Sequence, residues 1–158
     1  MKPIEMIEEK LKEIDLCDRQ GAILYSGNDT IQKGDFYFLG ANPGGHSDHF
    51  SSDVDDTISN QLNRKDTSFN EYFEGRWQKR RRPAARPGEA LLQRRIRFLF
   101  SRLGIDLRNT LSSNLVFVRS STINEFDLCW SDVADRCWAI HELLLATVRP
   151  KTIIVYGE

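Results

Sequence analysis

The most constraining feature of this sequence is the run of residues 35–39 (DFYFL), which is continuously apolar after Asp35 and leads directly into a loop rich in proline and glycine, residues 40–45. Strands buried on both faces of a sheet have such unbroken runs, whereas half-exposed strands alternate apolar and polar residues. In the loop, Pro43 favours an extended Asn42, and the glycines permit close approach to a ligand. Residues 34–45 therefore predict a central strand that feeds an active-site loop, although an ordinary tight turn explains the loop spacing equally well.

Strand and helix patterns alternate along the rest of the chain. Apolar runs predict two further strands, at 111–118 and 152–156. Helical spacing of apolar residues predicts three helices, at 3–15, 88–103 and 133–148. Residues 46–88 are polar, and a structureless connection of more than forty residues is unusual in a compact domain. A further helix is therefore expected near 68–79. The alternation predicts an α/β fold of three layers, α/β/α, around a mostly parallel central sheet.

Apolar stripes on the helices identify the faces expected in the core. In the helix at 88–103 the stripe is Leu92, Ile96, Leu99 and Leu103, with Gly104 as the expected C-cap. In the last helix it is Val133, Cys137, Ile140, Leu144 and Val148. Right-handed crossovers would bring the strand ends to one rim, where open α/β sheets bind ligands. The segments expected at that rim are 40–45, 118–121 and 157–158, together with Asn114.

Composition narrows the class of protein. The chain has 158 residues, of which 40% are hydrophobic and 28% charged, so a single domain over residues 1–158 is expected. No apolar run approaches the roughly 20 residues that span a bilayer, and the acidic N-terminus is not a signal peptide. We therefore expect no membrane contact and a cytoplasmic location. The three cysteines and His46 and His49 lack metal-ligand spacing, so neither a disulfide nor a metal is expected.

Charge is strongly segregated along the chain. Residues 76–108 hold eleven basic side chains against two acidic ones, a net charge of +9, although the whole chain carries −1. Such a field favours a polyanionic partner, most simply nucleic acid, and a solvated helix face with a flexible loop is the equally weighted alternative. Prolines and a glycine predict a basic mobile segment at about 76–88. The predicted DNA contacts are Lys79, Arg80, Arg81, Arg82, Arg86 and Arg119.

Three segments resemble one known family. Residues 34–45 (GDFYFLGANPGG) are similar to the first motif of the uracil-DNA glycosylase superfamily, in the G-x-N-P-G form of its mismatch-specific and single-strand-selective branches. Residues 112–121 (SSNLVFVRSS) resemble its base-recognition strand, and residues 149–158 (RPKTIIVYGE) its helix-to-strand segment. The order and spacing fit across about residues 34–158. The glycine pattern is neither G-x-G-x-x-G nor a Walker loop, which disfavours nucleotide binding.

The resemblance implies a uracil-DNA glycosylase-like fold and hydrolysis of the N-glycosidic bond of uracil or a related damaged base in DNA, without a cofactor. It gives Asn42 the role of positioning the attacking water. Asn114 would read the Watson–Crick edge of an extruded base. Phe50 is the candidate to stack on the base, with Phe69 or Phe73 as alternatives for which core packing is the favoured interpretation. The base-binding loop would comprise Gly40, Ala41, Pro43 and Gly44.

One family motif has no counterpart here. Superfamily members usually carry His-Pro-Ser after a further strand, and none of His46, His49 and His141 precedes a proline. We therefore expect a C-terminally truncated chain that lacks the last strand. The alternative is a catalytically inactive module that binds nucleic acid or protein. A bare sheet edge after residues 152–156 would favour a homodimer or strand addition from a partner.

Overall fold

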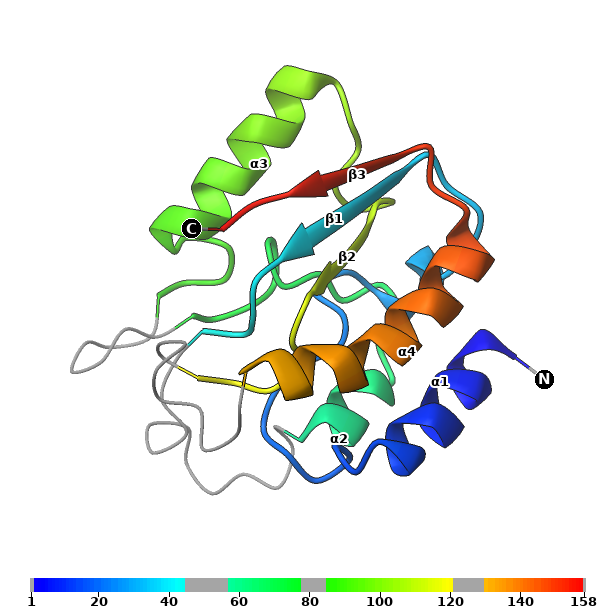
Figure 1. The fold of residues 1–158 in the computed structure, drawn as a ribbon. Coiled ribbons are helices and arrows are strands. Elements are labelled where there is room, and N and C mark those ends of the chain that lie inside the picture. The colour runs from blue at the N-terminus through cyan, green and yellow to red at the C-terminus, as the bar shows by residue number, and fades with distance from the viewer. Residues whose placement is uncertain (1, 45–56, 78–84, 121–129, 158) are drawn as a thin grey trace.

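The computed structural model describes residues 2–44, 57–77, 85–120 and 130–157 (Figure 1). It is a mixed α/β structure, as the sequence predicts. The helices and strands follow one another in the order α1 (Pro3–Glu13), η1 (Asn28–Thr30), β1 (Phe36–Gly40), α2 (Ile58–Leu62), α3 (Leu91–Leu103), β2 (Leu111–Asn114), α4 (Trp130–Val148) and β3 (Thr152–Val155).

The three strands form one open, all-parallel sheet in the order β2-β1-β3. The strand predicted at residues 35–39 is β1, Phe36–Gly40 in the structure, and it lies at the centre of the sheet, as its unbroken apolar run predicts. Gly40 is aligned with Asn114 of β2, and Leu39 with Val155 of β3. This register brings the loop after β1 and the ends of β2 and β3 to one edge of the sheet.

Helices cover both faces of β1. Tyr37 and Leu39 share a core cluster with the predicted stripe of α4, including Cys137, Ile140 and Leu144, and all members of that stripe are buried. Phe38 points the other way, into a second cluster with Ile96 and Phe100 of α3 and with several aromatic residues. Figure 1 shows α3 on one side of the sheet and α1 and α4 on the other.

The predicted stripe of α3 is wrong in part. Ile96 is buried, but Leu92, Leu99 and Leu103 are 42, 40 and 51% exposed, and the core-facing residues are Gln93, Ile96 and Phe100. The Gln93 amide donates hydrogen bonds to the backbone carbonyls of Glu71 and Gly75, so the helix turns a polar residue inward. The predicted C-cap is correct, because Gly104 has the left-handed conformation at φ 67°.

Two other expected elements differ from the structure. Residues 68–77 form turns, not a helix, because the Asn70 side chain accepts a hydrogen bond from the backbone N–H of Tyr72 and competes with helical bonding. The second strand ends at Asn114, not at Val118. Beyond it the chain turns to bond residues 20–22, where the Ala22 N–H donates to the Phe117 carbonyl at 3.0 Å.

His141 of α4 is a buried histidine whose titration links folding stability to pH. Its Nδ1 accepts a hydrogen bond from the Tyr37 hydroxyl at 2.7 Å, and its Nε2 donates to the Leu115 carbonyl at 3.1 Å. Burial lowers the pKa of His141 below its ordinary value, an effect that the backbone bonds partly oppose. As the pH drops below about 6.5, the imidazole of His141 therefore takes up a proton in the unfolded chain before it does so in the folded one. This uptake favours the unfolded state, so the free energy of unfolding falls with falling pH.

We expect the melting temperature of the wild type to fall between pH 7 and pH 5, and His141→Gln to flatten this slope. Glutamine keeps an amide that can bond Tyr37 but has no titrating group in this range. Scanning calorimetry at several pH values measures both slopes. Equal slopes for the two proteins would contradict the assignment.

Candidate active site

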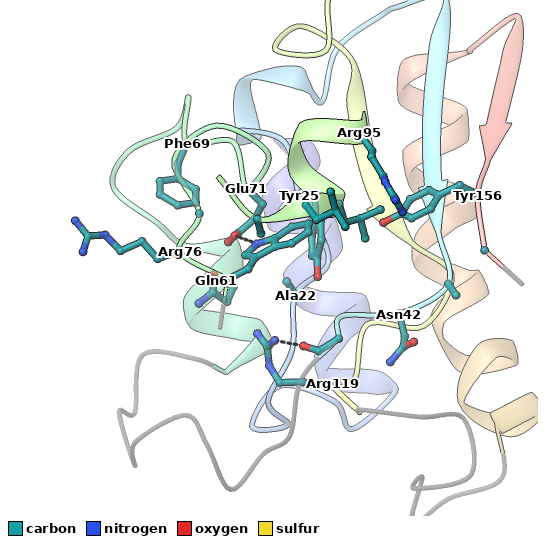
Figure 2. Close-up of a pocket in the computed structure, with 18 of the residues that line it drawn as sticks. Ala22, Tyr25, Asn42, Gln61, Phe69, Glu71, Arg76, Arg95, Arg119 and Tyr156 are labelled. Atoms are coloured by element: carbon teal, nitrogen blue, oxygen red, sulfur yellow. Dashed lines mark hydrogen bonds between the residues drawn. The ribbon is translucent and has the colours of Figure 1, made fainter. Parts of the chain in front are cut away.

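A cavity of about 630 Å³ opens at the carboxyl end of the sheet (Figure 2). Its walls come from segments far apart in the sequence. They include Ala41, Asn42 and Gly44 after β1, Tyr156 and Gly157 after β3, the turns around residues 69–77, and the first turns of α3. Pockets of this size hold small organic ligands.

Asn42 is fixed by its amide nitrogen. This nitrogen donates to the carbonyls of Pro43 and Ser120 and to the Ser120 hydroxyl, each at 3.1 Å. Its side-chain oxygen makes no hydrogen bond with any residue that the structure describes. That oxygen can accept a hydrogen bond from water, but an amide cannot act as a general base.

Asn114 is the most unusual polar residue of the site. It is 1% exposed, and neither its amide nitrogen nor its oxygen makes a hydrogen bond of ordinary geometry with a described residue, although the Tyr25 hydroxyl lies close enough for the amide to lower the pKa of Tyr25. An unpaired buried polar group costs about 1–3 kcal/mol. A Cβ added at Gly40 would lie 2.6 Å from Asn114 Oδ1 and 2.9 Å from Tyr156 Cε1, so only glycine leaves this space open. The Asn114 amide therefore lies unpaired beside two residues that line the cavity, Tyr156 and Tyr25.

Aromatic rings form much of the cavity wall. The rings of Tyr25 and Trp77 are 5.7 Å apart, and Tyr156 stacks on Phe38 with centroids 4.9 Å apart and an angle of 16°. Burial raises the pKa of Tyr25; nearby Glu71 and Tyr156 add to the effect, whereas Arg119 and Asn114 oppose it. Burial also raises the pKa of Tyr156. Both phenols therefore stay neutral near pH 7 and can donate hydrogen bonds.

The three phenylalanines proposed for base stacking lie in different places. Phe69 lines the cavity, and the guanidinium of Arg64 lies 4.1 Å from its ring centroid. Phe73 packs against the core cluster that contains Phe38, in agreement with core packing, the interpretation favoured for it from the sequence. Phe50 lies outside the described residues.

Two of the arginines that line the cavity are engaged by neighbours. Arg64 donates to Glu71 at 3.0 Å, and the other oxygen of Glu71 accepts from Trp77 Nε1 at the same distance. Arg119, predicted as a DNA contact, donates to the Gly44 carbonyl at 2.6 Å and so supports the loop after β1. Figure 2 shows this bond at the lower edge of the cavity.

The remaining predicted DNA contacts are only partly described. Arg86 is exposed, ahead of α3. Lys79, Arg80, Arg81 and Arg82 lie outside the part of the chain that the structure describes, as does most of the segment predicted to be mobile.

Several residues of the cavity could not be identified from the sequence. Tyr25, Trp77 and Glu71 stand in no recognisable pattern, and they reach the cavity only through the tertiary fold. Tyr156 could have been found, because it directly follows β3 at the rim already expected to bind a ligand.

Among residues 2–44, 57–77, 85–120 and 130–157, no group of histidine, cysteine, aspartate or glutamate side chains could hold a metal ion. The same residues contain no helix of the length and apolarity needed to cross a membrane. The chain matches no family model, no curated protein and no solved structure.

Proposed function

We propose that this protein is a DNA base-excision glycosylase that hydrolyses the N-glycosidic bond of uracil or a related damaged base, on a three-layer fold like that of uracil-DNA glycosylases. The observation that carries the proposal is the buried, unpaired amide of Asn114 beside an aromatic cavity. A carboxamide offers one donor and one acceptor side by side. The imide edge of uracil offers the complementary acceptor and donor.

The cavity suits an extruded base. Enzymes that act on a base in DNA take it out of the stack and hold it between apolar or aromatic side chains and hydrogen-bonding groups. Here Tyr25, Trp77 and Tyr156 supply the aromatic faces, and Gly40 leaves room above Asn114. The resemblance of residues 34–45 to the first motif of the family supports the same assignment.

Asn42 is suited to orient the attacking water. Its nitrogen is held by Pro43 and Ser120, which leaves its oxygen to accept a hydrogen bond from the water. The water oxygen would bond to C1′ of the sugar while the C1′–N1 bond breaks and its electron pair leaves with the base. Because an amide is not basic, the water proton would pass to solvent. Asn42 would therefore contribute by orientation, not by proton abstraction.

The direct test uses uracil-containing oligonucleotides, both single- and double-stranded, followed by alkaline cleavage of abasic sites. We expect strand scission with the wild type and about a 10²-fold lower rate with Asn42→Ala, the order of effect that misplacing a reacting group produces. Asn63→Ala, at an exposed asparagine outside the cavity, is the matched control and should retain the wild-type rate. No scission by folded wild type in large excess over DNA would refute the proposal.

A catalytically inactive nucleic-acid-binding module of the same fold is the second candidate. It is favoured by the +9 segment and by the position of His141, which is buried in the core and bonded to Tyr37, away from the cavity. It predicts salt-dependent DNA binding without cleavage. Fluorescence anisotropy should then show a shallower salt slope when Arg80, Arg81 and Arg82 are changed to glutamine, and an unchanged slope would rule it out.

An open sheet edge also fits the proposed homodimer or protein partner. β3 is one of the two outer strands of the described sheet, and Ile153 and Val155 are 45 and 68% exposed. Light scattering on the purified chain distinguishes a dimer from a monomer.

A further inference from the structure

Two of the four arginines that line the cavity, Arg76 and Arg95, make no hydrogen bond or ion pair with any of the residues described. Arg95 belongs to α3. Arg64 and Arg119 are by contrast bonded to Glu71 and to the Gly44 carbonyl. In Figure 2 the Arg95 side chain runs from α3 toward the ring of Tyr156, whereas Arg76 extends away from the cavity.

The position of Arg95 is set by a well-anchored helix. Gln93, two residues earlier, is fully buried; its nitrogen donates to the Gly75 carbonyl at 2.8 Å and its oxygen accepts from the Ala90 N–H at 2.9 Å. Ile96 is 4% exposed and belongs to the same core cluster as Phe38. The ring of Phe38 in turn stacks on Tyr156. These contacts fix the helix beside the end of β3, so the guanidinium stays within reach of the cavity.

We propose that Arg95 stabilises the negative charge that develops on the departing base. This inference rests on the proposed glycosylase function. When the C1′–N1 bond breaks, the electron pair goes to the base, which becomes an anion until it takes a proton from solvent. A positioned cation near that charge lowers the barrier. Arginine suits the role, since its guanidinium keeps its charge at all relevant pH values and offers a planar set of donors to carbonyl oxygens.

The leaving-group test separates this role from DNA binding. Single-turnover rates are measured at saturating protein on single-stranded DNA that carries uracil or 5-fluorouracil, the latter being the better leaving group. Arg95→Gln should lower the rate about 10²-fold for uracil, as loss of a donor to developing charge does, and distinctly less for 5-fluorouracil. Arg95→Lys should recover part of the loss. Arg136→Gln, at an exposed arginine of α4 outside the cavity, should leave both rates unchanged.

A phosphate contact would behave differently. It would weaken DNA binding equally for the two bases and leave both saturated rates intact, and that result would overturn the inference while the glycosylase proposal stands.

A binding measurement tests Arg95 without catalysis. 5-Nitrouracil is an anion at pH 8, and its absorbance reports binding. We expect the wild type to bind this anion more tightly than uracil, Arg95→Gln to lose that preference, and Arg136→Gln to keep it. Equal binding by wild type and Arg95→Gln would refute the role of Arg95. Failure of the wild type to bind either base would refute the base-binding pocket, and with it the inference.

Discussion

Replacing Asn114 with leucine is expected to lower glycosylase activity by about 10³-fold and, at the same time, to raise the melting temperature. The activity falls because the amide that would read the base is gone, and loss of a preorganised polar contact in a buried site costs about 10²–10³ in rate or more. The stability rises because the side chain is 1% exposed with both polar atoms unpaired. An apolar side chain of similar size removes that desolvation cost.

Asn70 is the matched control for this experiment. It is equally buried, but its oxygen accepts from the Tyr72 N–H at 3.0 Å and its nitrogen donates to the Leu107 carbonyl at 3.4 Å. Asn70→Leu should therefore destabilise the fold by about 1–3 kcal/mol, because those backbone groups lose their partners. Thermal melts of both variants measure the contrast. If Asn114→Leu destabilises the protein as much as Asn70→Leu, Asn114 is a structural residue.

Truncation of Phe38 should produce the largest loss of stability. Its ring is fully buried at the centre of β1, with Phe100 4.8 Å away in an edge-on contact and Tyr156 stacked at 4.9 Å. Phe38→Ala is expected to cost about 3–5 kcal/mol, since it removes a large side chain and leaves a cavity. This is a large share of the roughly 5–15 kcal/mol by which a domain is stable. For a domain of this size such a loss should lower the melting temperature by roughly 10 °C.

Phe98→Ala serves as the comparison, because this ring is on the same helix as Phe100 but is 68% exposed. Its melting temperature should stay near that of the wild type. Calorimetry measures both variants. A small loss for Phe38→Ala would show that the aromatic cluster around β1 repacks, and it would remove the basis for a rigid Tyr156 at the cavity.

The strands and the last helix follow from local pattern. β1 could be predicted because its apolar run is unbroken, and α4 because its apolar residues from Val133 to Val148 recur at helical spacing. α3 is apolar on more than one side, so periodicity could not choose between Leu92 and Gln93. The choice depends on the carbonyls of Glu71 and Gly75, which only the folded chain brings near.

Some residues of the candidate site could likewise be predicted from the sequence, and others could not. Asn42 and Asn114 could be predicted because each lies at the end of a parallel strand, and parallel strands end on one rim. Tyr25 and Glu71 belong to turns whose sequences carry no functional pattern, and the Glu71 N–H bonds the Tyr25 carbonyl at 2.7 Å only after folding. Their contribution to the cavity could not be read from spacing.

The scattered origin of the cavity walls has a practical consequence. Residues from Ala22 to Gly157 meet there, so no fragment of the unfolded chain can offer the same surface to a small molecule. A nucleobase that fits will bind the folded protein but not the unfolded chain, and so will raise the melting temperature by mass action. At a concentration 100 times its dissociation constant it adds about 2.7 kcal/mol to the free energy of unfolding. A melting-point screen of free nucleobases and nucleosides can therefore rank the chemical preferences of the cavity before any reaction is known.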